Sequence, residues 1–203
     1  MIRSLQALDR REQLARFTGH GGRYEDAVQY GDYKIESIQD DNDLRLILWN
    51  PEKPCIVAVI DKHEHVAVID DIEYSTTCTR DGRMQKGQGT RKMIQFMLDY
   101  LSQHGADTVE LSDKSTVMCN GVKVRLGLMY FFKFGETWYE HFFGFKPSEK
   151  YRANYETIKQ KRYILGDVSN KPCDYFTDDV IDDLVNKLGF GFFYNVSWVK
   201  QLP

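Results

Sequence analysis

The sequence predicts an α/β fold (α+β in some schemes), with a mixed, mostly antiparallel sheet flanked by helices. Two observations support this prediction. Four segments rich in Ile, Val, Leu or Tyr lie between residues 33 and 79 and are separated only by short clusters of Asp, Asn, Pro or Lys, which is typical of an antiparallel meander. A helical pattern from 89 to 103 then leads to another β-rich segment, a connection long enough for a parallel crossover.

In the first half, residues 1 to 18 predict an amphipathic helix that ends at the glycines of 19–22. Four strands are expected at Tyr33 to Gln39, Asp43 to Trp49, Cys55 to Asp61 and Val66 to about Thr79. Residues 50–54 and 61–65 have the composition of turns. The helix that follows carries an apolar stripe at i, i+3, i+4 and i+7, made of Ile94, Met97, Leu98 and Leu101. It ends near Gly105 and precedes a strand at Thr108 to Leu111.

In the second half, Asn120-Gly121 predicts a type I′ hairpin turn, because both residues accept positive φ angles. Helices are expected at Leu126 to Phe134, Tyr151 to Ile164 and Asp178 to Leu188, and a strand at Phe190 to Val199. Thr177 would cap the last helix and Gly189 would terminate it. Core packing is expected for the aromatic residues Tyr130, Phe131, Phe132, Phe134, Phe142 and Phe143.

The most informative stretch runs from Met84 to Met93, where Gly87 and Gly89 open the predicted helix of 89–103. Glycine lets the chain bend sharply, so that successive N–H groups at the positive end of a helix can face a phosphate. Arg83, Lys86, Arg91 and Lys92 add cationic side chains. The Walker pattern fails because Gln88 and Gly89 stand where Lys and Ser or Thr are required. The Rossmann pattern fails because Lys92 stands in place of a small residue.

The loop resembles the pyrophosphate loop of the GNAT superfamily of N-acetyltransferases, written Q/R-x-x-G-x-G/A, with Met84 at the Gln or Arg position. Lys86 to Thr90 is similar to the K-G-x-G-T of the lysine- and histone-acetylating branch. Tyr139, followed by Gly144-Phe145, fits that branch's tyrosine, four residues, then Gly-Phe. The resemblance spans Ile69 to Phe145, and residues 135–139 with 113–115 also look like short GNAT-like proteins of large DNA viruses.

The resemblance implies a single GNAT-like domain over 1–203, with a core at about 25–147 and an extension at about 148–203. It also implies acetyl-coenzyme A as cosubstrate. The expected cofactor-binding residues are Thr77, Cys78 and Thr79 along the pantetheine arm, and Met84, Gln85, Lys86, Gly87, Gln88, Gly89, Thr90 and Arg91 at the pyrophosphate. The position of the family's general base is Glu73, and Tyr139 would lie close to the cofactor thiol.

Acetyl transfer requires the amine to lose a proton before it attacks the thioester, and Glu73 is the candidate base. Asp70 and Asp71 are close enough in sequence to replace it. Tyr139 is the candidate acid that protonates the leaving thiolate. His141 lies close by in the sequence and could replace it, but on a helix it is expected to point elsewhere.

Other chemistries have weaker support. His63 and His65 lack a third ligand, so no metal site is expected. Ser112, Ser115 and Cys119 have no evident histidine base, which disfavours nucleophilic catalysis.

Composition agrees with a small enzyme. The 203 residues can bury a substantial core, and the formal charge of −3 provides no global basic field for nucleic acid. The four cysteines are widely spaced, so we expect free thiols in a reducing compartment. No apolar run approaches the roughly 20 residues that span a bilayer, and no signal peptide is evident. We therefore expect an intracellular protein, cytoplasmic or nuclear, without a membrane partner.

The predicted function is an acetyl-coenzyme A-dependent N-acetyltransferase that acts on a protein lysine or a polyamine-like amine by direct attack. The sequence leaves open the acceptor, the acyl group and the oligomeric state. The alternative is a catalytically silent GNAT-fold binding module, which the departure at Met84 favours.

Overall fold

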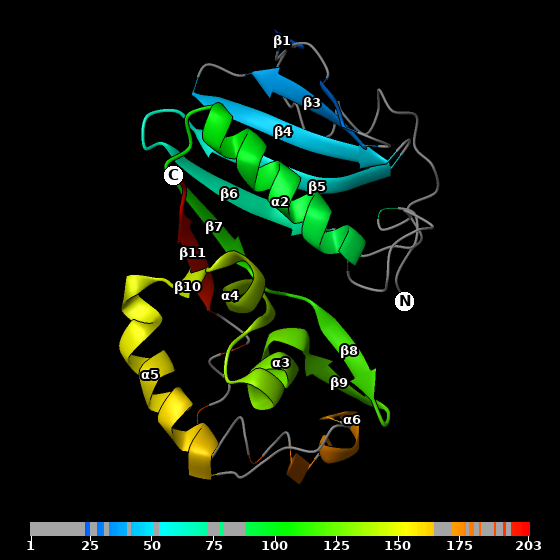
Figure 1. Cartoon of the computed structure of the whole chain (residues 1–203), viewed down its shortest axis with the longest axis vertical. Coiled ribbons are helices and arrows are strands. Elements are labelled where there is room, and N and C mark those ends of the chain that lie inside the picture. Colours follow the sequence, from blue (N-terminus) through cyan, green and yellow to red (C-terminus); the bar gives the residue numbers. More distant parts are fainter. Residues whose placement is uncertain are drawn as a thin grey trace. The chain divides into compact units, whose positions relative to one another are not determined.

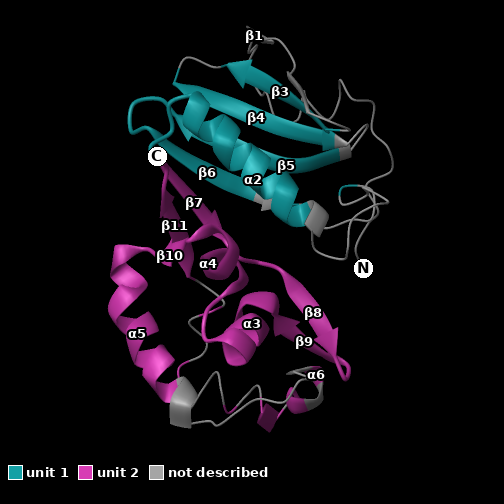
Figure 2. Ribbon diagram, viewed as in Figure 1, with its two compact units in different colours: residues 1–107 teal, residues 108–203 magenta. Residues whose placement is uncertain are grey.

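A computed structural model describes residues 23–24, 28–30, 33–39, 42–50, 53–72, 78, 88–164, 172–177, 179–180, 183, 189, 193 and 196–203. The chain forms two compact units, residues 1–107 and 108–203 (Figure 2), and each is described by itself. Both contain helices and strands, and every strand pairing described within a unit is antiparallel. The predicted class, a mostly antiparallel sheet with helices, is therefore confirmed in this coarse form.

Unit 1 is built on the predicted meander of four strands. These are β3 (Tyr33–Gln39), β4 (Asp43–Asn50), β5 (Lys53–Asp61) and β6 (Val66–Ile72). Two short strands, β1 (Arg23–Tyr24) and β2 (Val28–Tyr30), both pair with the edge of β3 that β4 leaves open. The turn from β5 to β6 is fixed by Asp61, whose carboxylate accepts from the backbone N–H groups of His63 and Glu64 at 2.8 and 3.0 Å.

Helix α2 (Gln88–Gln103) lies across one face of this meander (Figure 1). Its predicted apolar stripe is confirmed, because all four of its residues are at most 1% exposed. The central strands β4 and β5 are apolar on both faces, as expected for strands covered on both sides. Gly105, at a φ of 88°, follows the helix at the predicted place.

In unit 2, β11 (Ser197–Gln201) lies between β7 (Thr108–Ser112) and the short β10 (Lys146–Pro147). Side chains alternate across this sheet, so that Leu111 and its partner Trp198 are buried while Glu110 lies on the opposite face. The predicted hairpin is confirmed as β8 (Thr116–Cys119) and β9 (Val122–Arg125). Its turn residues Asn120 and Gly121 have φ angles of 50° and 85°.

Four helices complete the described part of unit 2: α3 (Leu126–Phe134), α4 (Trp138–Phe143), α5 (Glu149–Ile164) and α6 (Pro172–Tyr175). Thr137 caps α4 by accepting from the Glu140 N–H at 3.3 Å, and Gly144 ends it in the left-handed region. The aromatic core contains Phe131, Phe132 and Phe143 as predicted. Phe134 was wrongly assigned to the core: it is 44% exposed, because it lies on the outer side of α3.

Some predictions fall on residues that the structure does not describe. These are the helix of 1–18 and most of the segment 178–195, where a helix and the start of a strand were expected. The strand predicted at Phe190 to Val199 is described only from Ser197 onward, where β11 begins. Within the described residues, no helix is both long and apolar enough to cross a bilayer.

The prediction of free thiols was wrong. Cys55 is bonded to Cys78 in unit 1, and Cys119 to Cys173 in unit 2, which leaves no free cysteine. The spacing along the chain concealed both pairs, because each joins residues that only the fold brings together. Disulfides persist in oxidising compartments and are rare in the cytosol. The expectation of a reducing compartment therefore loses its basis, and the intracellular location stays a prediction.

Candidate functional site

The N-terminus of α2 is the part of the predicted cofactor site that the structure describes best. The helix begins at Gln88, directly after Gly87, and its first turn holds no acidic residue. Thr90 is only 8% exposed, and its hydroxyl has no hydrogen-bond partner within the described residues. Arg91 is half-buried and Lys92 is exposed. Free N–H groups at the positive end of a helix attract an anion, and no carboxylate of the first turn competes for them.

The other predicted residues of this region are only partly described. Gln88 and Gly89 belong to the helical backbone of α2, whereas Glu73, Thr77, Thr79 and the segment 84–87 lie outside the described residues. Strand β6, the fourth of the meander, ends at Ile72. Glu73 therefore follows that strand directly, and Asp70, one of its possible substitutes, is exposed on β6.

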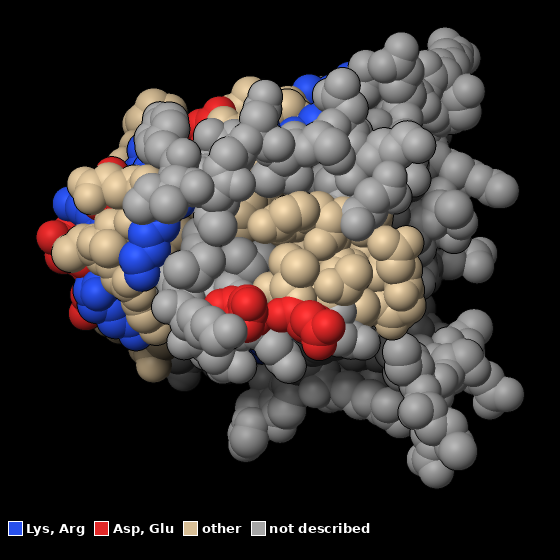
Figure 3. Space-filling model, turned by 90° about the horizontal axis from the view of Figure 1, so that it is seen from below, with Lys and Arg blue, Asp and Glu red and all other residues tan. Residues whose placement is uncertain are grey.

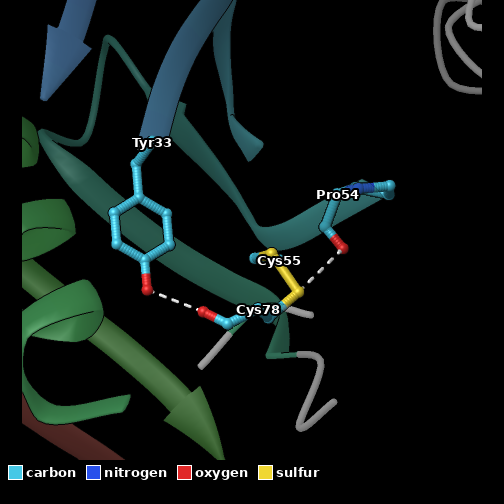
Figure 4. The surroundings of a disulfide bond; sticks show 4 residues. All are labelled: Tyr33, Pro54, Cys55 and Cys78. Carbon is cyan, nitrogen blue, oxygen red and sulfur yellow. Dashed lines mark hydrogen bonds between the residues drawn. A yellow bond between two sulfur atoms is a disulfide. The ribbon is translucent and has the colours of Figure 1, made fainter. Parts of the chain in front are cut away.

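Cys78 is fully buried, and two residues hold it from different strands (Figure 4). Its sulfur is bonded to that of Cys55 on β5 and lies 3.9 Å from the carbonyl oxygen of Pro54. Its own carbonyl oxygen accepts a hydrogen bond of 2.6 Å from the hydroxyl of Tyr33 on β3. The side chain of Cys78 is thus bonded to one strand and its carbonyl to another. Cys78 itself lies in a turn, so the prediction of a strand up to about Thr79 was wrong at this residue.

Tyr139, the predicted acid, lies on α4 in unit 2 and is 8% exposed. Its ring packs edge-on against Trp138 and Phe145. Burial raises the pKa of the phenol far above its usual range, and the charge of Asp113 raises it further. Tyr139 therefore keeps its proton at neutral pH and can donate a hydrogen bond. His141 is exposed, and its Nδ1 lies 2.6 Å from the carboxylate of Glu136.

Asp113, just after β7, is a buried carboxylate to which the sequence analysis assigned no role. Its Oδ1 accepts from the backbone N–H of Ser115 at 3.0 Å and from the Ser115 hydroxyl, and the carboxylate also accepts from the N–H of Gly127. Burial raises the pKa of Asp113, although these hydrogen bonds pull it down. Asp113 thereby caps α3, whose own N-cap residue, Arg125, makes no side-chain cap.

Glu140, next to Tyr139 on α4, is the centre of a second buried network. Its side chain is 2% exposed, and its Oε1 accepts from Lys146 and Lys159 at 3.0 Å each. Its Oε2 accepts a short hydrogen bond from the Tyr155 hydroxyl. Burial alone would raise the pKa of Glu140, but hydrogen bonds from Tyr155, Lys146 and Lys159 outweigh it and hold the pKa below its usual value. This network joins α4 to α5 and β10.

His63 and His65, the histidine pair considered for a metal, each have a polar partner in the structure. The Nε2 of His63 lies 3.2 Å from the Asn42 side chain, and the Nδ1 of His65 lies 2.9 Å from the carbonyl oxygen of Gly105. Within the part of the chain that the structure describes, no group of three or more His, Cys, Asp or Glu side chains could hold a metal ion.

Unit 2 also carries an open groove of about 850 Å³ beside the start of α5. Its charged lining consists of Lys146, Lys150, Arg152, Lys200, Glu110 and Glu149. Two of these cations are already paired, Lys146 with Glu140 at 3.0 Å and Arg152 with Glu149 at 2.8 Å. Figure 3, a view from below, shows basic and acidic residues intermixed at the left of the picture. The groove is therefore not a surface of one charge.

Tyr33, Asp113 and Glu140 were not predicted to be structural centres. Asp113-x-Ser115 has the local pattern of a carboxylate that accepts from a backbone N–H two residues later. This contact could therefore have been predicted from the sequence. The pairing of Tyr33 with Cys78 spans 45 residues and leaves no local trace. Comparisons with protein families, with curated proteins and with solved structures found no match.

Proposed function

We propose that this protein is an N-acetyltransferase that moves an acetyl group from acetyl-coenzyme A to an amine. The observation that carries the proposal is the start of α2 at Gln88, directly behind Gly87 of the K-G-x-G-T pattern, with no acid in its first turn. The buried hydroxyl of Thr90, which lacks a partner within the described residues, adds a donor beside that end. These features fit the binding of a pyrophosphate.

In the proposed reaction Glu73 removes a proton from the amine, directly or through water, and the amine attacks the thioester carbonyl. Coenzyme A leaves as a thiolate, which is already a fair leaving group. The raised pKa of Tyr139 makes its phenol a poor proton donor, so its proposed role is a hydrogen bond to the thiolate. The acceptor is a protein lysine or a polyamine-like amine, whose positive charge suits a chain of formal charge −3.

Wild-type protein is expected to bind acetyl-coenzyme A in isothermal titration calorimetry, and Gly89→Val is expected to weaken that binding at least about tenfold. A branched side chain at the start of α2 would block the approach of a pyrophosphate to the backbone. The melting temperature without cofactor should change little. Met84→Gln should hold or improve the affinity, because it restores the donor of the family pattern.

The matched control is Gly105→Val, which places the same side chain beyond the other end of α2. Gly105 has a φ of 88°, and a Cβ at this position would have no neighbour within 4 Å. The variant therefore strains the turn but should leave the affinity unchanged. No binding to the wild type at millimolar acetyl-coenzyme A would refute the proposal. If Gly89→Val binds acetyl-coenzyme A with wild-type affinity, the glycines only form a turn at the start of the helix. The assignment of Glu73 as the general base then loses its basis, because it depends on the position of this loop.

Turnover separates an enzyme from a silent binding module. Glu73→Gln is expected to lower the rate of coenzyme A release about 100-fold or more, because general-base catalysis contributes at least that much. Tyr139→Phe keeps the shape of a buried ring and should lower the rate less. Glu64→Gln, at an exposed position in the turn before β6, is the control and should leave the rate unchanged.

The assay measures thiol release with lysine peptides, polyamines and aminoglycosides at saturating acetyl-coenzyme A. If the cofactor binds but no acceptor gives thiol release, the protein is better described as a binding module. That alternative already has some support from the departure at Met84.

A further inference from the structure

We infer that Asp113 is a positioning residue for Tyr139, because it fixes the starts of the two helices around that residue. The inference rests on the proposed function, in which the Tyr139 phenol donates a hydrogen bond to the leaving thiolate. Asp113 follows strand β7, whereas Tyr139 lies on α4, and both belong to unit 2. The proposed reaction does not otherwise use this buried carboxylate.

The carboxylate of Asp113 is held against the start of α3. It accepts hydrogen bonds from the backbone N–H of Gly127, the second residue of α3, and from both the N–H and the hydroxyl of Ser115. A Cβ on Gly127 would lie 2.9 Å from the Oδ2 of Asp113. Non-bonded heavy atoms pack best at roughly 3.5 to 4 Å, so any side chain at this position would displace the carboxylate.

The start of α4 packs against the same glycine. Thr137, the N-cap residue of α4, is 1% exposed, and its Cγ2 would lie 3.9 Å from a Cβ on Gly127. Tyr139 is the second residue of this helix. The negative charge of Asp113 acts on the Tyr139 phenol, so the two groups lie close enough to interact through a buried region. Asp113 thus connects the end of β7 with the starts of α3 and α4.

The Tyr139 hydroxyl depends on this connection for its position. Contacts with Trp138 and Phe145 hold the ring, but the hydroxyl makes no hydrogen bond within the described residues. It is therefore a donor that a bound thiolate can use, and the negative charge of Asp113 disfavours the loss of its proton. Loss of Asp113 should lower turnover through Tyr139 and leave binding of the cofactor at α2 unchanged.

The test is a double-mutant cycle between Asp113→Asn and Tyr139→Phe, with kcat and KM measured by thiol release. Asparagine keeps the size of the side chain but offers one acceptor oxygen in place of two and carries no charge. Alone, Asp113→Asn is expected to lower kcat about three- to tenfold, the worth of one hydrogen bond, and to leave the KM for acetyl-coenzyme A within about twofold. In the Tyr139→Phe background the same substitution should change kcat less than about twofold, because it then has no phenol to position.

Gly127→Ala is the second variant, because its methyl group would displace the same carboxylate without changing any charge. It should give the same pattern in the two backgrounds, and it replaces Asp113→Asn in the cycle if that variant does not fold. The control is Asp179→Asn, at an exposed carboxylate of unit 2, which should leave kcat and KM unchanged. All variants are assayed below their melting temperatures.

Equal losses of kcat in the wild-type and Tyr139→Phe backgrounds would overturn the inference, because Asp113 would then support the fold and not Tyr139. Failure of both Asp113→Asn and Gly127→Ala to fold would contradict it for the same reason. Wild-type kcat in both variants would also overturn it and leave the proposed function intact. No thiol release by the wild type with any acceptor would refute the proposed function, and the inference with it.

Discussion

Replacing both cysteines of a disulfide by serine is expected to lower the free energy of unfolding by about 4 kcal/mol for Cys119–Cys173 and about 3 kcal/mol for Cys55–Cys78. A disulfide restricts the unfolded chain, and the restriction grows with the length of the loop that it closes. The sequence separations are 54 and 23 residues, respectively. The first pair also clamps the β8–β9 hairpin to α6, where Asn120 donates to the carbonyl oxygen of Cys173 at 2.9 Å. A lone two-stranded hairpin is only marginally stable in water.

Urea unfolding of the two double-serine variants and the wild type measures these losses. Titration of the denatured wild type with a thiol reagent, before and after reduction, provides the control and should find no thiols and then four. Four thiols before reduction would show that the bonds do not form. A larger loss for Cys55–Cys78 than for Cys119–Cys173 would contradict the loop-length argument.

Glu140→Gln is expected to lower the free energy of unfolding by about 2 kcal/mol. The substitution removes the anion that both Lys146 and Lys159 contact at 3.0 Å, while a neutral amide still fills the space. The lysine side chains are 62% and 29% exposed, so both can turn toward water, and the cost stays below that of a stranded buried charge. Glu136→Gln is the control, because Glu136 is 36% exposed and paired only with His141 in the described network. It should cost less than about 1 kcal/mol.

The same network predicts a pH dependence. The folded pKa of Glu140 is held below its unfolded value of about 4.3. Its contribution is therefore fully present above that value and is lost as the pH falls through the folded pKa. Urea unfolding between pH 7 and pH 3 should show a smaller acid-dependent loss in Glu140→Gln than in the wild type. Parallel curves for the two proteins would contradict an ionised Glu140 in the native state.

Most of the secondary structure could be predicted from the sequence, because that information is local. The four strands of the meander follow short runs of β-rich residues between turn residues, and β3 was predicted with the same bounds that the structure shows. Helix α2 follows a 3.6-residue apolar period, and its start differs from the prediction by one residue. The Asn120-Gly121 turn follows from the φ angles that those residues accept.

The candidate site could be predicted only in part. The glycine spacing predicted where α2 starts, and the apolar period predicted its buried stripe. Both predictions are confirmed. The roles assigned to Glu73 and to segment 84–87 stay predictions. Tyr139 was expected to be an acid, and the structure shows it buried beside Asp113 with a raised pKa. That environment changes its proposed role from proton donor to hydrogen-bond donor.

Which distant residues contact each other could not be predicted from the sequence, because it depends on the packed fold. The disulfide between Cys119 and Cys173 and the hydrogen bond from Tyr33 to Cys78 span 54 and 45 residues. The three side-chain partners of the Glu140 carboxylate come from α5 and β10, elements that only the fold brings to α4. Local periodicity reports whether a residue faces the core, but it carries no information on which side chain lies opposite. That information exists only once the chain is packed, because burial and the pKa of a buried group depend on every element around it.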